Sequence, residues 1–151
     1  MRKFTSPLRS LASYFGIGFL LHLAWENLQA PLYINFLSYA QHFEACLRAT
    51  ATGDMFAMLL IYLSLAIIHQ RLFWLTDKSV YRHPATWIIP ILIGVMIAVI
   101  FELRAVYATQ SWQYTDTMPL VPFLQIGITP VLQMIIIPPL TILLTRKISS
   151  G

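Results

Sequence analysis

Four ionisable residues in or beside apolar segments are the ones in this chain best suited to chemistry. His22 and Glu26 stand four residues apart within the apolar segment 18–33, so a helix would place them on one face. Glu102 lies near the end of a second apolar segment, and Asp54 begins a third. Ionisable side chains in a bilayer are costly and usually face a bundle interior or a cavity, where they mark function. We therefore predict that these residues form one His/carboxylate site.

Such a site would support two kinds of chemistry. Two close carboxyl groups in a low dielectric cannot both ionise cheaply, so one of them would hold a proton near neutral pH. A protonated acid can protonate a double bond of an apolar substrate or relay protons. His22 with two or three carboxylates could instead ligate a divalent cation, but His-x-x-x-Glu is a weak motif, and we predict no metal site. The plainest interpretation is that these side chains only hydrogen-bond between helices.

Each apolar segment carries a stripe of polar or small residues that would position the site. Gly94 and Ala98 precede Glu102 at four-residue spacing, and small residues let membrane helices approach closely, so Glu102 should face inward. We predict that Glu26, Glu102 and His22 form the catalytic group. The residues expected to bind the substrate beside them are Asn27, Asp54, Trp112, Tyr114, Gln125 and Gln133.

The composition is that of an integral membrane protein. The 151 residues are 58% hydrophobic and only 11% charged, whereas soluble domains average roughly 25% charged residues. A membrane-spanning helix needs about 20 mostly apolar residues. The predicted fold is all-α, a bundle of four transmembrane helices in a single domain, residues 1–151, with approximate spans 11–30, 54–75, 86–107 and 122–144.

Three segments refine this prediction. The basic start and the apolar segment after it resemble a secretion signal, but that segment continues without a small-residue cleavage site, which favours a retained span. Between the first two spans, apolar residues recur at helical spacing and predict a short amphipathic outer helix; they are Phe36, Tyr39, Ala40, Phe43 and Leu47. In the last span, Pro130 and the pair at 138–139 predict kinks or breaks.

The basic residues predict the orientation of the bundle. Eight of the ten lysines and arginines lie on one side of the predicted spans, and only Arg48 and Arg104 do not; the eight are Arg2, Lys3, Arg9, Arg71, Lys78, Arg82, Arg146 and Lys147. The positive-inside rule then puts both termini in the cytoplasm, in a multi-pass protein of the inner (plasma) membrane. We therefore expect the basic residues behind the net charge of +4 to orient the chain in the lipid bilayer rather than to bind nucleic acid.

The leading functional hypothesis is a small inner-membrane protein that binds or processes a lipid-like or isoprenoid-like molecule from the outer leaflet. Glu26 and Glu102 would be its acids, with Trp112 and Tyr114 at the mouth of the site. Two alternatives stay open: an accessory or assembly subunit whose polar faces contact a membrane partner or a second copy, and a proton or cation transporter with a path to His69. The sequence specifies neither a cofactor nor whether the protein is an enzyme, since it contains no P-loop or Gly-x-Ser-x-Gly motif.

Overall fold

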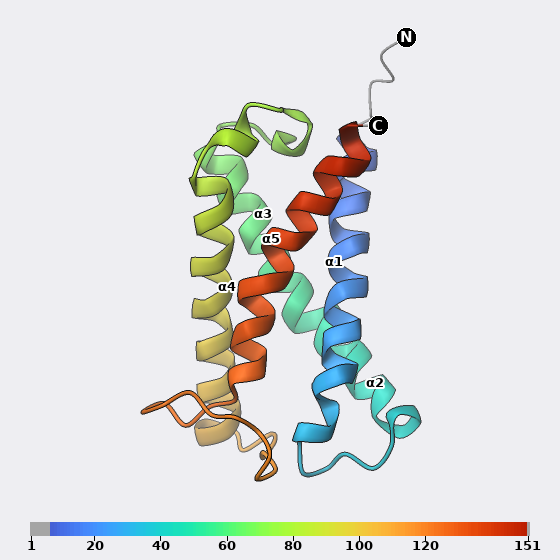
Figure 1. Cartoon of the computed structure of the whole chain (residues 1–151), viewed down its shortest axis with the longest axis vertical. Coiled ribbons are helices and arrows are strands. Elements are labelled where there is room, and N and C mark those ends of the chain that lie inside the picture. The colour runs from blue at the N-terminus through green and yellow to red at the C-terminus, as the bar shows by residue number, and fades with distance from the viewer. Residues whose placement is uncertain (1–6, 151) are drawn as a thin grey trace.

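The computed structural model describes residues 7–150 and is an all-α bundle whose helices run roughly along one long axis (Figure 1). The helices are α1 (Pro7–Gln29), α2 (Tyr39–Ala49), α3 (Met55–Ile68), α4 (Ala85–Leu103) and α5 (Ile128–Ser150). Short 3-10 turns lie at Ala30–Leu32, Trp74–Thr76 and Val80–Arg82. No sheet occurs within residues 7–150, where the β-pairing consists of isolated bridges between Tyr33 and Tyr114 and between Leu120 and Gly127.

The helices α2 and α3 form one continuous element, joined by a π-helical turn at Thr50–Asp54. The predicted short outer helix is therefore fused to the second predicted span. The combined helix begins after Ser38, whose hydroxyl accepts a hydrogen bond from the Gln41 backbone N–H at 3.3 Å. It ends at Ile68 rather than near residue 75, because the chain turns at Gln70, which has a φ of 54°.

Within residues 7–150, three helices are long and apolar enough to cross a membrane: Tyr39–Ile68, Ala85–Ala108 and Ile128–Ile148. They indicate a multi-pass membrane protein. The remaining long helix, α1, has 23 residues, a length of about 34 Å at roughly 1.5 Å per residue. Its polar residues, among them Arg9, His22 and Glu26, make it less apolar than the other three.

The last helix begins later than predicted and continues through its prolines. Residues 119–127 form a loop instead of the first turns of the predicted span, and Phe123 and Gln125 adopt left-handed φ angles of 67° and 52°. Pro130 lies in the first turn of α5, where its missing N–H removes no helical hydrogen bond. The prolines at 138 and 139 lie inside the helix, which runs on to Ser150, so the predicted break does not occur.

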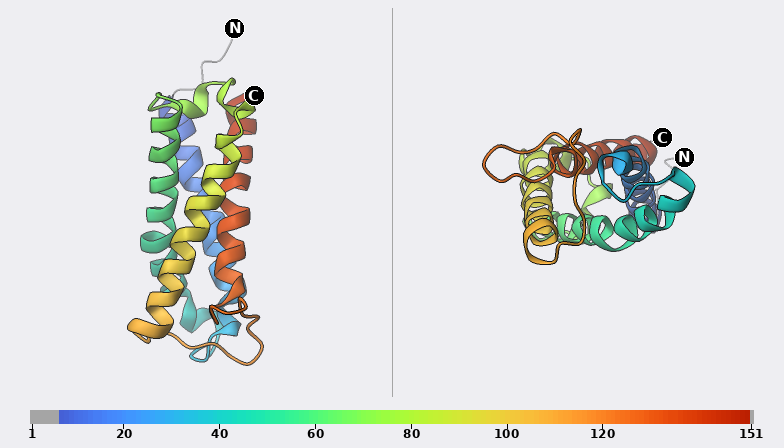
Figure 2. Two further views of the ribbon diagram at one scale, coloured as in Figure 1. Left: turned by 90° about the vertical axis from the view of Figure 1, so that its left-hand side faces the viewer. Right: turned by 90° about the horizontal axis from the view of Figure 1, so that it is seen from below.

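Connections and helix ends separate to two ends of the bundle (Figures 1 and 2). One end contains the start of α1, the α3–α4 connection and the end of α5; we call it the basic end, because Arg9, Arg71, Lys78, Arg82, Arg146 and Lys147 belong to it. The opposite end contains α2 and the loops 30–38 and 109–127. Arg48 and Arg104 lie on its elements, whereas Arg2 and Lys3 fall outside the described residues.

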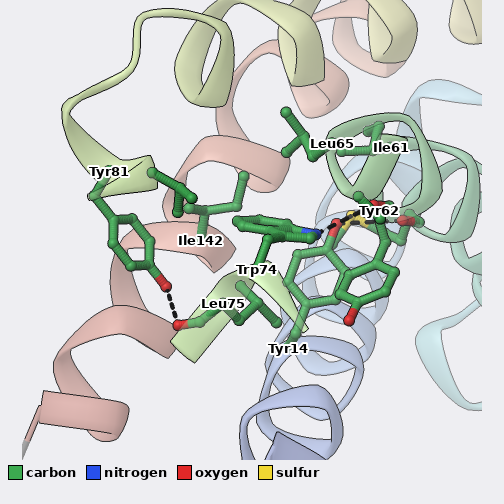
Figure 3. Close-up of a cluster of buried hydrophobic side chains, with 11 residues drawn as sticks. Tyr14, Ile61, Tyr62, Leu65, Trp74, Leu75, Tyr81 and Ile142 are labelled. Carbon is green, nitrogen blue, oxygen red and sulfur yellow. Dashed lines mark hydrogen bonds between the residues drawn. The ribbon is translucent and has the colours of Figure 1, made fainter. Parts of the chain in front are cut away.

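An aromatic core fills the basic end. Trp74, from the α3–α4 connection, is fully buried, and its ring centroid lies 6.4 Å from that of Tyr14 and 5.7 Å from that of Tyr62 (Figure 3). Its Nε1 donates to the Tyr62 carbonyl oxygen at 3.2 Å, and the Tyr81 hydroxyl donates to the Leu75 carbonyl oxygen at 2.6 Å. The connection is thus fixed to the helices by both burial and hydrogen bonds.

Candidate functional site

A cavity of about 470 Å³ lies at the opposite end, between α1, α2, α4, α5 and the 109–127 loop. We call it the acid-lined cavity. The apolar part of its lining includes Ala30, Ala45, Ala49, Ile97, Ala98, Phe101 and Met134, and the polar part includes Glu26, Gln29, Asp54, Glu102, Trp112 and Gln133. Mostly apolar walls with a few convergent polar groups are typical of small-molecule sites, which measure roughly 300–1,000 Å³.

Gln133 of α5 joins polar residues of two other helical segments. Its Nε2 lies 2.8 Å from Nδ1 of His22 and 3.3 Å from Oδ2 of Asp54. His22 Nδ1 and Asp54 Oδ2 are themselves 3.6 Å apart, so the three side chains form one buried cluster. His22 does not line the cavity, but a single hydrogen bond connects it to Gln133, which does. It is therefore positioned to orient the lining residues rather than to touch an occupant.

Gln29 extends this cluster to Glu26. Its Nε2 donates to Glu26 Oε1 at 3.0 Å and lies 3.4 Å from Gln133 Oε1. The two side chains meet because residues three apart on a helix are neighbours. Asn27, in contrast, donates from Nδ2 to the Leu23 carbonyl oxygen at 2.7 Å on its own helix and does not line the cavity.

Glu102 is held by two aromatic residues of the 109–127 loop. Tyr114 donates its hydroxyl hydrogen to Glu102 Oε2, and Trp112 Nε1 lies 3.4 Å from the same oxygen. Burial, and then the hydrogen bond to Glu102, raises the pKa of Tyr114, so this phenol keeps the proton that it donates. Tyr33 packs against both rings, with centroids 6.3 Å from Trp112 and 5.7 Å from Tyr114. The loop thus covers Glu102 with an aromatic wall.

Two π-helical turns adjoin the acids. Asp54 is the last residue of the turn at Thr50–Asp54, and the turn at Arg104–Ala108 begins two residues after Glu102. The second turn ends with the Thr109 N–H bonded to the Arg104 carbonyl oxygen at 2.8 Å. Turns of this kind are rare and occur frequently at functional sites. Asp54 therefore lies in, and Glu102 next to, a π-helical turn of the kind that often occurs at functional sites.

The structure brings most of the predicted site residues together. Glu26, Asp54, Glu102, Trp112 and Gln133 line the cavity, and Tyr114 reaches it through Glu102. Comparisons with protein-family models, with curated proteins and with solved structures found no match. The case for function therefore depends on the geometry of the site itself.

Gln125 lies apart from the predicted stripe of the last helix. It is exposed, outside α5, and does not line the cavity. The prediction assumed one helix through Gln125, Thr129 and Gln133, but the chain turns within the 119–127 loop, where the Val121 carbonyl oxygen accepts from the Gln125 N–H at 2.9 Å. Of that stripe only Gln133 reaches the site.

Most of the lining residues were not predicted as part of the site, and Gln29, Tyr33 and Phe101 are examples. Gln29 could have been found from its i+3 spacing to Glu26, which puts both side chains on one face. Tyr33 and Phe101 carry no comparable signal, since each is one aromatic residue among many.

The structure also bears on metal binding. Within residues 7–150, no three His, Cys, Asp or Glu side chains are grouped closely enough to hold a metal ion.

Proposed function

We propose that this protein binds a lipid-like molecule in the acid-lined cavity, with the apolar body of the ligand against the alanine, isoleucine and phenylalanine wall. The observation that carries the proposal is the cavity itself: about 470 Å³ of space walled by apolar side chains, into which Glu26, Asp54 and Glu102 all face. A cavity that served only helix packing would be filled by side chains, because protein interiors are close-packed.

Access from the membrane would run between α2 and α4. Gly53 and Phe101 both line the cavity, and a Cβ added at Gly53 would lie 3.7 Å from the Phe101 ring. Phe101 is 39% exposed, so its ring lies partly at the surface of the bundle. A lipid-like molecule in the surrounding bilayer would therefore meet the cavity at this position without passing through water.

The membrane arrangement belongs to the same proposal. We take α1 as a fourth span and place the basic end in the cytoplasm, which puts the acid-lined cavity in the outer half of an inner-membrane protein. The described basic residues at that end support this orientation. Reporter fusions at the C-terminus and in the 109–127 loop test it. A reporter active outside the cytoplasm at the C-terminus would contradict the arrangement.

The direct test is to identify what the cavity holds. The protein would be purified from membranes in a mild detergent, and bound lipids would be detected by native mass spectrometry. Ala45→Phe and Ala49→Leu add bulk to two exposed positions that line the cavity, whereas Ala40→Phe alters an exposed position of the same helix outside the lining. We expect a co-purifying molecule to be lost from the first two variants and retained by the third. Equal retention by all three would mean that the cavity is not the binding site.

Binding and chemical conversion predict different phenotypes. A carboxylic acid in a water-poor cavity is the kind of group that protonates a double bond. A converting enzyme would therefore alter the lipid, quinone or pigment profile of a strain from which the gene is deleted, and restoring the Glu102→Gln variant would leave that profile altered. If the profile is unchanged after deletion, the protein binds its ligand without converting it.

A role as an accessory subunit is a second candidate, favoured by the loop 119–127. Phe123 at its tip is fully exposed, and Leu120 and Leu124 beside it are each 38% exposed. Such side chains suit contact with a neighbouring membrane protein. If this role is correct, Phe123→Ser should abolish co-purification of a partner in mild detergent, whereas Leu63→Ser, on the exposed side of α3, should retain it. We do not propose transport, because His69 does not line the acid-lined cavity and its ring lies at the basic end, with its centroid 6.1 Å from that of the buried Trp74.

A further inference from the structure

The hydrogen-bond donors beside the three acids of the cavity are engaged by the protein itself. Gln29 Nε2 faces Glu26 and Gln133, and Gln133 Nε2 faces His22 and Asp54. The indole of Trp112 and the hydroxyl of Tyr114 both face Glu102. Each of these polar hydrogens is therefore directed at an acceptor that the chain provides. Other donor-bearing side chains of the lining include Asn35, His42 and Gln113.

The acceptors, in contrast, are in excess. The Gln29 side chain is 95% buried, since the residue is 5% exposed, and it lines the cavity, yet its Oε1 has no partner among the described residues. In this orientation the amide nitrogen faces the acceptor oxygens of Glu26 and Gln133. A buried acceptor without a donor is destabilising, because it has lost its hydrogen bonds to water. The carboxyl oxygens of Glu26, Asp54 and Glu102 add further acceptor positions in the same space.

The charges of the lining have the same bias. Among the described residues that line the cavity are three acids but neither a lysine nor an arginine. Arg48, on the neighbouring stretch of α2, has its side chain 74% exposed and pairs with Glu44 at 3.8 Å. An anionic head group would find no cation to pair with there and would face three acids in a low dielectric, where like charges repel strongly.

We infer that the head group recognised in this cavity is a hydrogen-bond donor without negative charge, and that a protonated primary amine on an apolar chain is its best match. This inference rests on the proposed binding function and narrows its ligand class. An ammonium group supplies three donors and one positive charge. It can satisfy Gln29 Oε1 and at the same time balance an ionised acid, and charge-assisted hydrogen bonds of this type are the strong ones. A phosphate or carboxylate head supplies neither.

The experiment uses four probes that share a dodecyl chain: dodecylamine, dodecanol, dodecanoic acid and dodecyl phosphate. Each is added to the full-length protein in nanodiscs of neutral phosphatidylcholine at pH 7, and binding is measured as the rise in unfolding temperature with probe concentration. The Ala45→Phe variant, with the cavity narrowed, corrects for probe that dissolves in the bilayer, and Ala49→Leu replaces it should Ala45→Phe not fold. We expect the amine to bind about tenfold or more tightly than the acid or the phosphate, with the alcohol between them.

The results separate this inference from the proposal on which it rests. If no probe stabilises the wild type more than the narrowed variants, the cavity does not bind lipid-like molecules and the proposed function fails. If dodecanoic acid or dodecyl phosphate stabilises the wild type as much as the amine, the cavity binds such molecules but the inferred head group is wrong. The Gln29→Leu variant removes the unpartnered acceptor, and we expect it to reduce the preference for amine over acid by several-fold. An unchanged preference in that variant would overturn the role of Gln29.

Discussion

The two ends of the bundle handle buried polar groups in opposite ways. At the basic end, the aromatic side chains bring their polar atoms to backbone acceptors: the Tyr62 hydroxyl donates to Leu72 O at 2.5 Å, and Trp87 Nε1 donates to Tyr81 O at 3.1 Å. At the cavity end, acids and amides from α1, the Thr50–Asp54 turn and α5 bond to one another beside the acid-lined cavity, and Gln29 Oε1 is left without a partner among the described residues. Buried hydroxyl oxygens of Thr141 and Thr145 on α5 also lack a partner among the described residues, but neither lines a cavity that holds acids. The aromatic end therefore suits stability, and the end where acids and an unpartnered amide oxygen line a cavity suits binding.

The largest expected effect tests the stabilising role of the basic end. Trp74→Ala removes the centre of the aromatic core and should lower the free energy of unfolding by about 3–5 kcal/mol, as large-to-small core substitutions do. The matched change at the cavity end is Phe101→Ala, which we expect to cost much less because that ring is already partly exposed. Denaturant unfolding in detergent measures both. Equal losses would remove the proposed difference between the two ends.

The next effect concerns Glu102. Glu102→Leu leaves the Tyr114 hydroxyl and the Trp112 indole without their acceptor and should cost about 1–3 kcal/mol of stability. Glu102→Gln keeps an acceptor oxygen of the same shape and should unfold like the wild type, but it should bind amine probes less tightly because its head carries no charge. Thermal melts with and without dodecylamine measure both properties. Wild-type behaviour of Glu102→Gln in both assays would make Glu102 a packing residue only.

An effect of comparable size tests helix packing between the ends. Gly94 lets α4 approach α5, since a Cβ there would lie 2.9 Å from the Met134 carbonyl oxygen and 3.1 Å from Met134 Cβ. Gly94→Ala should therefore destabilise the protein by about 1–3 kcal/mol through overpacking. Gly16→Ala is the control, because a Cβ at Gly16 meets nothing within 4 Å, and the better helix propensity of alanine should raise stability by about 0.5–1 kcal/mol. If both variants lose stability, the loss in Gly94→Ala does not come from its contact with Met134.

The smallest effect is the contribution of His69, at the basic end, to the pH dependence of stability. His69 lies 2.9 Å from Thr86 Oγ1, and burial, followed by the positive charge of His83, lowers its pKa below the ordinary value. The unfolded chain therefore binds this proton more readily than the folded one, so stability is full above pH about 6.5 and falls as the pH drops below that value. Between pH 8 and pH 5 the His69→Gln variant should therefore lose less stability than the wild type, as measured by denaturant unfolding at each pH. The same decline in His69→Gln would assign it to another group.

The sequence predicted the bundle and the convergence of its acids better than it predicted where helices begin and bend. Apolar length and four-residue spacing are local properties, so Glu26, Glu102 and Gln133 could be placed on inward faces from the sequence alone. The fusion of α2 with α3 depends on a π turn, and no residue pattern at 50–54 predicts such a turn. Gln125 was misplaced for the same kind of reason, since its left-handed φ of 52° arises from loop closure rather than from its own side chain.

The π turn at Thr50–Asp54 also determines what a change in chain length would do to the wall of the cavity. A π turn holds one more residue than an α turn, so the side chains before it are rotated by about 100° relative to those of an uninterrupted helix. Deleting one residue within 50–54 would restore a regular α-helix while keeping every span at membrane length. The face of α2 that carries Cys46 and Ala49 would then turn away from α4, and the cavity would lose one wall without any change in the aromatic core.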